Sequence, residues 1–100
     1  MRVDYERTGG FAGMKMASSF DLDQLPAAEA DEIRRLLDEA GFAKLPESLM
    51  GSAPVPDQFN YRITVTAESW KHTVVTSDSS APESLRPLLD TLGQMARQKR

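Results

Sequence analysis

Cysteine is absent from the 100-residue chain, and histidine and tryptophan occur once each, as His72 and Trp70. The missing thiols exclude disulfide bridges, cysteine nucleophiles and cysteine metal ligands. The lone histidine has none of the clustered ligand spacing that zinc sites use, so we interpret it as a half-buried side chain satisfied by a neighbour. We therefore predict no metal and no cofactor, and we expect a reducing compartment, the cytoplasm.

Long apolar runs are missing as well. Because the first twenty residues carry five charges, we expect neither a signal peptide nor a membrane span there.

Twelve basic and fifteen acidic residues give a formal net charge of -3, the wrong sign for binding nucleic acid through its phosphates. Apolar residues still make up 40% of the chain, enough for one globular domain over residues 1–100.

The motifs of the common catalytic classes are missing too. There is no GxSxG turn around a serine and no GxGxxG or GKS/T phosphate loop. Five carboxylates fall mainly on the polar side of a predicted helix: Glu29, Asp31, Glu32, Asp38 and Glu39. Phe59 and Tyr61 share a strand face with Ile63 and Val65, so we interpret them as core residues and not as a platform for nucleotide bases. We predict that the protein is neither an enzyme nor a nucleic-acid binder.

The residues that are present alternate between apolar and polar in four segments. This period of two predicts strands over residues 1–8, 11–20, 59–66 and 70–76. Gly9 and Gly10 supply the turn between the first two strands. Residues 42–57 contain three prolines and no sustained period, so we predict a long connection with one short helical turn near residues 47–50.

Two other segments have helical spacing. The first covers residues 26–41, where Pro26 suits the first helical position and Gly41 suits the C-terminal stop. The second begins near Leu85 and continues to the C-terminus; Pro87 falls in its first turn if Ser84 caps it, and there its missing N–H costs little. The order of elements is therefore strand, strand, helix, repeated once.

This order predicts an α+β fold: a four-stranded antiparallel sheet in two strand-strand-helix units, with both helices packed on one face. If each helix runs back along the sheet, the glycine turn at residues 9–13, the long loop before Gln58 and the turn at residues 77–82 lie at the same end. The turns at residues 21–25 and 67–70 lie at the other end. An interface built from loops would use the first end.

Five segments resemble the emfourin family in order and spacing. They are the N-terminal strand leading into GGFAG, LLDEAGF followed by LP, DQFNYRITV, HTVVTSD and the final PxxLRPLLDTL. Emfourins are small bacterial inhibitors of protealysin and other thermolysin-like (M4) zinc metallopeptidases. The resemblance implies a protein inhibitor that occludes the active-site cleft of a partner peptidase and performs no chemistry itself.

The loop geometry and this resemblance together lead to a candidate partner-binding surface. Glycines there would let the backbone approach a peptidase closely, Phe11 would enter an apolar specificity pocket, and Asp78 with two serines would hydrogen-bond the rim. The predicted surface consists of Gly9, Gly10, Phe11, Gly13, Asp78, Ser79 and Ser80. We expect a monomer or weak dimer with no membrane partner. The alternative is an interaction or regulatory module that has no peptidase target.

Overall fold

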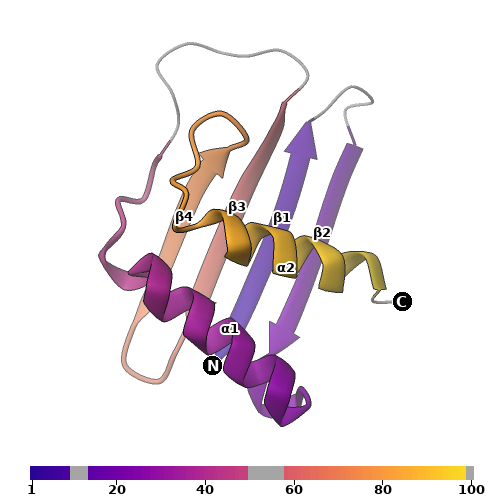
Figure 1. Ribbon diagram of the computed structural model, residues 1–100, viewed down its shortest axis with the longest axis vertical. Coiled ribbons are helices and arrows are strands. Elements are labelled where there is room, and N and C mark those ends of the chain that lie inside the picture. Colours follow the sequence, from indigo (N-terminus) through magenta and orange to yellow (C-terminus); the bar gives the residue numbers. More distant parts are fainter. Residues whose placement is uncertain (10–13, 50–57, 99–100) are drawn as a thin grey trace.

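The computed structural model describes residues 1–9, 14–49 and 58–98 (Figure 1). Its sheet contains β1 (Arg2–Gly9), β2 (Met14–Asp21), β3 (Phe59–Thr66) and β4 (Lys71–Ser77), in the order β2-β1-β3-β4 with all neighbours antiparallel. The described residues also form two α-helices, α1 (Ala27–Ala40) and α2 (Arg86–Gln98). The predicted α+β class and the four-stranded antiparallel sheet are confirmed.

The register of the sheet places apolar side chains in rows across the strands. Val3 of β1 lies opposite Phe20 of β2 and Val65 of β3, and Tyr5 lies opposite Ile63. All five side chains are buried. Because side chains alternate between the two faces of a strand, these rows leave the polar residues of the same strands on the other face.

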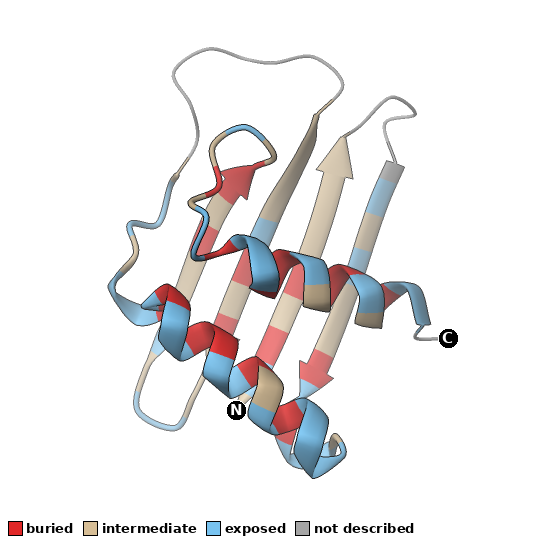
Figure 2. Cartoon of the chain, in the orientation of Figure 1, coloured by how far each residue is buried: buried red, intermediate tan, exposed pale blue. Residues whose placement is uncertain are grey.

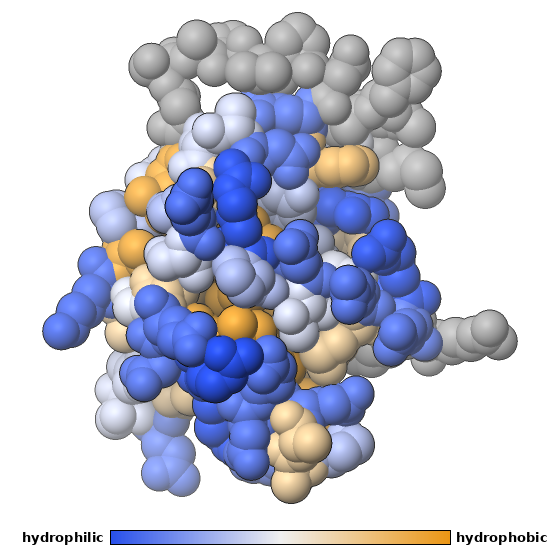
Figure 3. Space-filling model, in the orientation of Figure 1, coloured by the Kyte–Doolittle hydropathy of each residue, from blue (hydrophilic) through white to orange (hydrophobic). Residues whose placement is uncertain are grey.

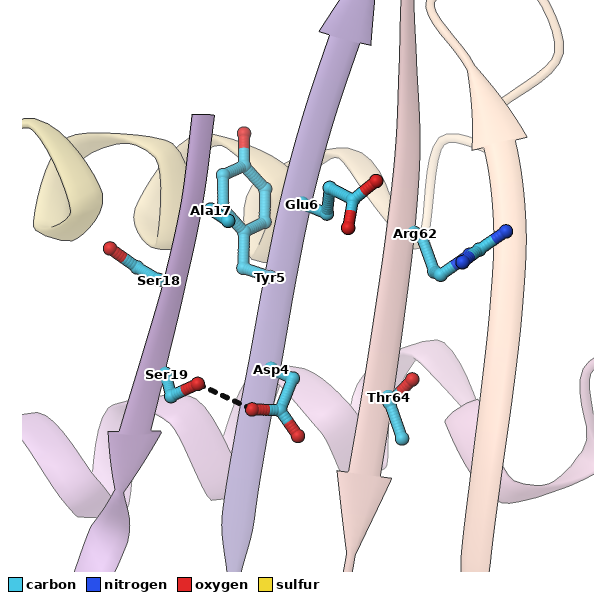
Figure 4. A pocket seen from close by; sticks show the side chains of 8 residues that line it. All are labelled: Asp4, Tyr5, Glu6, Ala17, Ser18, Ser19, Arg62 and Thr64. Carbon is cyan, nitrogen blue, oxygen red and sulfur yellow. Dashed lines mark hydrogen bonds between the residues drawn. The ribbon is translucent and has the colours of Figure 1, made fainter. Parts of the chain in front are cut away.

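Both helices lie on the same side of the sheet in Figure 1, and the view from the opposite side in Figure 4 places them behind the strands. Their inward residues are buried against the sheet, and Figure 2 shows these buried positions on the facing surfaces of helices and strands. Hydrophilic residues cover most of the outer surface of the two helices (Figure 3). No helix among the described residues is long and apolar enough to cross a membrane.

The helix ends follow the sequence closely. Gly41 has a left-handed backbone with φ of 60°, and its N–H donates to the carbonyl oxygens of Leu37 and Asp38, so the predicted C-terminal stop is confirmed. Pro26, the predicted first helical residue, is instead the N-cap of α1, and the helix begins one residue later at Ala27. Pro87 is the second residue of α2, within the first turn as predicted.

The predicted helical turn near residues 47–50 is wrong over the part that the structure describes. Ser48 forms a parallel bridge with Val75 at the outer edge of β4. Val75 N–H donates to Glu47 O at 2.8 Å, and Leu49 N–H donates to Val75 O at 2.7 Å. An edge strand exposes unpaired backbone groups, and this extended segment satisfies some of them, which a helical turn would not do.

Two short 3-10 helices connect the larger elements. One, η1 (Leu22–Gln24), follows β2 directly, and η2 (Phe42–Lys44) follows α1. Strand β2 begins at Met14, so the part of the predicted strand at residues 11–13 lies outside the described residues. Strand β4 is shifted by one residue from the predicted range of 70–76.

Candidate functional site

The ends of β1 and β3 approach each other closely at one end of the sheet. Gly9 is the last residue of β1, lies opposite Phe59 and has φ of 90°. A Cβ atom added at Gly9 would lie 2.9 Å from the carbonyl oxygen of Gln58, which is closer than real Cβ contacts allow. Both the backbone conformation and the space therefore require glycine here.

The connection from β4 to α2 is fastened to the start of β3. Ser79 donates twice to the side-chain oxygen of Gln58, from its backbone N–H at 3.1 Å and from its hydroxyl at 2.8 Å. Asp78 N–H also donates to Phe59 O at 3.1 Å. We call the end of the sheet formed by Gly9, Gln58, Phe59, Asp78 and Ser79 the loop end.

The Asp78 carboxylate connects the residues of the loop end through hydrogen bonds. Its Oδ2 accepts from the backbone N–H of Phe59 at 3.0 Å, and its Oδ1 accepts from the Tyr61 hydroxyl at 2.5 Å. Arg86 donates to the Asp78 carbonyl oxygen at 2.9 Å. Burial and the hydrogen bond to Asp78 raise the pKa of Tyr61 above its ordinary value. Asp78 therefore stabilises the structure of the loop end.

Arg7 lies on the helix side of the sheet at this end. Its guanidinium carbon is 4.5 Å from the centre of the Phe59 ring, and its Nη2 is 3.9 Å from the Met16 sulfur. Tyr61, directly opposite Arg7 in the register, has its ring centre 6.3 Å from that of Tyr5. Arg7, Met16, Phe59 and Tyr61 are all half-buried, and we call these four residues the loop-end patch.

This half-burial modifies the interpretation of Phe59 and Tyr61 as core residues. Tyr61 packs against the buried cluster, but it stays partly exposed, and Phe59 carries the guanidinium of Arg7. The cause is the length of the strands. They extend beyond α2 toward the loop end, where no helix lies over them in Figure 1. Alternation identifies the face of a strand but not how far a helix covers it.

The described members of the predicted partner-binding surface lie at this end: Gly9, Asp78, Ser79 and Ser80. Ser79 is exposed, while the Ser80 N–H donates to the Ser77 carbonyl oxygen at 3.1 Å. Three further members, Gly10, Phe11 and Gly13, lie outside the described residues. Their predicted contacts stay predictions, as do those of the four described residues.

Sequence reasoning missed Gln58 and Arg7. For Arg7 a signal was present, because the residue continues the inward series of Val3 and Tyr5 with a charge. A cation at an inward position indicates either a buried partner or the point where the core ends. Nothing in the sequence identified Gln58 as the acceptor for Ser79, because 21 residues separate them.

Comparison with protein families settles the classification. The Emfourin family model matches residues 5–93, which is most of the chain and includes all the strands in part or in full. The chain belongs to the Emfourin family. Emfourins are inhibitors of metallopeptidases, and this agrees with the prediction that the chain is not an enzyme. Comparisons with curated proteins and with solved structures found no match.

The open face of this emfourin sheet, opposite the helices, carries short polar and charged side chains. A shallow hollow of about 680 Å³ there is lined by residues of β1, β2 and β3 (Figure 4). Ser19 donates to Asp4 at 2.5 Å, and Arg2 donates to the same oxygen at 3.1 Å. Among the described residues, no three His, Asp or Glu side chains are grouped to hold a metal ion. Water-facing outer surfaces of antiparallel sheets commonly have this composition.

The single histidine and tryptophan of this emfourin lie away from the loop end. His72 donates from Nε2 to the Leu45 carbonyl oxygen at 2.6 Å and packs edge-on against Phe42, with ring centres 5.7 Å apart. Its predicted half-burial and neighbouring partner are confirmed. Trp70 is half-buried and borders a hollow between the end of α1 and the β3–β4 turn.

Proposed function

We propose that the chain inhibits a thermolysin-like (M4) zinc metallopeptidase by placing its loop end in the active-site cleft. The observation that carries the proposal is the hydrogen-bonded attachment of Asp78 and Ser79 to Gln58 and Phe59, beside the end of β1. Loops that are already held in one shape lose less conformational entropy when a partner binds them. The family supports the metallopeptidase as the partner class.

The proposed mechanism is occlusion without chemistry. The chain contributes a shaped surface: Gly9 and Gly10 allow close backbone approach, Phe11 enters an apolar pocket, and Ser79 and Ser80 hydrogen-bond the rim of the cleft. The zinc ion belongs to the partner, and the inhibitor keeps substrate away from it. We propose that the inhibitor acts in the cytoplasm as a monomer or weak dimer.

The first experiment measures the residual activity of a thermolysin-like peptidase, preferably one from the same genome, titrated with this protein after preincubation. We expect stoichiometric loss of activity. If micromolar protein leaves the cognate peptidase fully active, the inhibitor proposal is rejected, and the alternative of an interaction module without a peptidase target takes its place.

A matched pair of serines tests which end of the molecule binds. Ser79 lies at the loop end and Ser69 lies in the β3–β4 turn at the opposite end, and both are exposed. Because an arginine side chain at a tight interface blocks approach, Ser79→Arg should raise the inhibition constant more than tenfold, whereas Ser69→Arg should leave it unchanged. The reverse result would place the interface at the other end.

Phe11→Ala tests the proposed apolar anchor. Truncating an aromatic side chain that fills a pocket at an interface typically costs about 2 kcal/mol or more, so we expect the inhibition constant to rise more than tenfold. A melting temperature close to that of the unchanged protein would show that the loss comes from the contact. Unchanged inhibition would remove Phe11 from the interface.

A further inference from the structure

We propose that Arg7 is the charged anchor of the inhibitor and pairs with an acidic side chain at the rim of the partner peptidase's cleft. This inference rests on the proposed function and adds to it the chemistry of the partner surface. It assigns the binding role to the loop-end patch, on the helix side of the sheet, in addition to the loops themselves.

Arg7 has no anionic partner within the described part of the chain. Arg2, Arg34 and Arg35 each lie within 4.0 Å of a carboxylate oxygen, whereas the other described arginines do not: Arg7, Arg62, Arg86 and Arg97. Of these four, Arg7 is the one that is half-buried, while the other three are exposed. The contacts of Arg7, by contrast, are the ring of Phe59 and the sulfur of Met16, a weak acceptor. Within the described residues, most of its five N–H donors therefore have no acceptor and could bind a carboxylate of a partner.

The nearby carboxylate of Asp78 does not serve this purpose. Its two carboxylate oxygens accept from the Phe59 N–H and the Tyr61 hydroxyl, and neither of them lies within 4.0 Å of an Arg7 guanidinium nitrogen. The loop-end patch thus keeps a positive charge at a half-buried position, where a paired charge is screened less than at a fully exposed one.

Arg7 is also held in place before any partner arrives. Its position over the Phe59 ring and its contact with Met16 restrict a side chain that would otherwise be mobile. Arginine presents its donors in a rigid planar fork that suits a carboxylate, so a restrained arginine loses little entropy on pairing. Arginine and aromatic residues are also the side chains that most often dominate binding energy at interfaces.

The loop-end patch is continuous with the loop end. Tyr61 joins the loop-end patch to Asp78 through its hydroxyl, and Phe59 lies opposite Gly9. A peptidase surface that contacts Ser79 and the end of β1 therefore meets the patch on the same approach. We infer an aspartate or glutamate on that surface, next to an apolar side chain that contacts Met16 and Phe59.

The test compares Arg7→Met and Arg7→Glu with the control Arg62→Met. Arg62 neighbours Tyr61 on β3 at the same height of the sheet, but it lines the open face. Each inhibition constant is measured against the same peptidase at low and at high sodium chloride. We expect Arg7→Met to raise the constant about tenfold to a hundredfold, Arg7→Glu to raise it further, and Arg62→Met to change it less than about twofold.

The outcomes separate this inference from the function on which it rests. If the unchanged protein fails to inhibit, both are rejected. If it inhibits and Arg7→Met inhibits equally well, the function stands and the role of Arg7 is rejected. If Arg7→Glu is no worse than Arg7→Met, or if salt weakens the unchanged protein no more than Arg7→Met, the contact is not with a carboxylate and the inference is also rejected.

Folding is checked by thermal unfolding of each variant. If Arg7→Met melts below the assay temperature, Arg7→Lys replaces it, because lysine keeps the charge above the ring but lacks the planar fork. The inference then expects Arg7→Lys to inhibit more weakly than the unchanged protein and more strongly than Arg7→Gln. Equal inhibition by Arg7→Lys and Arg7→Gln would contradict it.

Discussion

Beneath the helices, the sheet is held by side chains such as Val3, Val65 and Ile33, none of which is exposed to solvent. At the loop end, the corresponding strand positions carry Arg7 and Phe59, which are half-buried. The chain is held there by hydrogen bonds that the Asp78 carboxylate accepts and that Ser79 donates. The region beneath the helices, which we call the covered region, is stabilised against unfolding mainly by the burial of apolar side chains. The loop end contributes less to stability, but its charge, aromatic rings and fixed loops are what a binding surface needs.

The largest effect expected on stability comes from a cavity in the covered region. Ile33 of α1 has no exposed surface, so Ile33→Ala removes buried methyl groups and should lower the free energy of unfolding by about 2–5 kcal/mol. Urea unfolding measures the loss. The inhibition constant of the fraction that stays folded should be unchanged. A loss below about 1 kcal/mol would show that this region repacks easily and would weaken the contrast with the loop end.

A pair of glycines compares the loop end with a helix end. Gly9 and Gly41 both have positive φ, but an added Cβ meets Gln58 O at Gly9 and meets nothing within 4 Å at Gly41. We expect Gly41→Ala to lower the free energy of unfolding by about 1 kcal/mol and Gly9→Ala by about 2–3 kcal/mol. Thermal unfolding of both variants checks this order. Equal losses would mean that the start of β3 moves aside without cost.

The hydrogen bond from Tyr61 to Asp78 should have an effect of intermediate size. Tyr61→Phe leaves Asp78 Oδ1 without this donor and should lower the free energy of unfolding near neutral pH by about 1–2 kcal/mol. Urea unfolding of both proteins measures it. A loss as large as that of Ile33→Ala would contradict the division between the two regions.

The hydrogen bond from Tyr61 to Asp78 also predicts that the free energy of unfolding depends on pH. Burial and the hydrogen bond to Asp78 raise the pKa of Tyr61 in the folded state above its ordinary value of about 10, so the folded protein holds this proton more tightly than the unfolded chain. The stabilisation is therefore complete below about pH 10 and is lost as pH rises toward the folded-state pKa. The difference in unfolding free energy between the unchanged protein and Tyr61→Phe should shrink above pH 10. A constant difference would show that Tyr61 titrates normally.

The smallest effect on stability is expected at Ser79. Ser79→Ala removes the hydroxyl donor to Gln58 but keeps the backbone donor, so the free energy of unfolding should fall by only about 0.5 kcal/mol. If the loop end binds the peptidase, the inhibition constant should still rise severalfold, because a looser loop must be ordered on binding. A change in stability alone, with inhibition unaltered, would assign Ser79 to the fold only.

Local patterns were sufficient for most of the fold. Alternation over residues 59–66 and helical spacing over residues 26–41 located β3 and α1 to within about one residue. Gly41 marked the end of α1 because glycine readily adopts the left-handed backbone conformation that this position requires. The extended segment at Ser48 was missed, because it is specified by the unpaired edge of β4 and not by its own composition.

By itself, the sequence determined the strands, the helices, the absence of thiol chemistry and the membership of the Emfourin family, because each depends on residue types at short or fixed spacing. Only the tertiary structure decided that Asp78 ties the β4–α2 connection to β3 and that Arg7 lies over Phe59 without a carboxylate among the described residues. Asp78 and Tyr61 are 17 positions apart in the sequence, and Arg7 and Phe59 are 52 positions apart. The sheet register brings such residues together, and no local pattern encodes it.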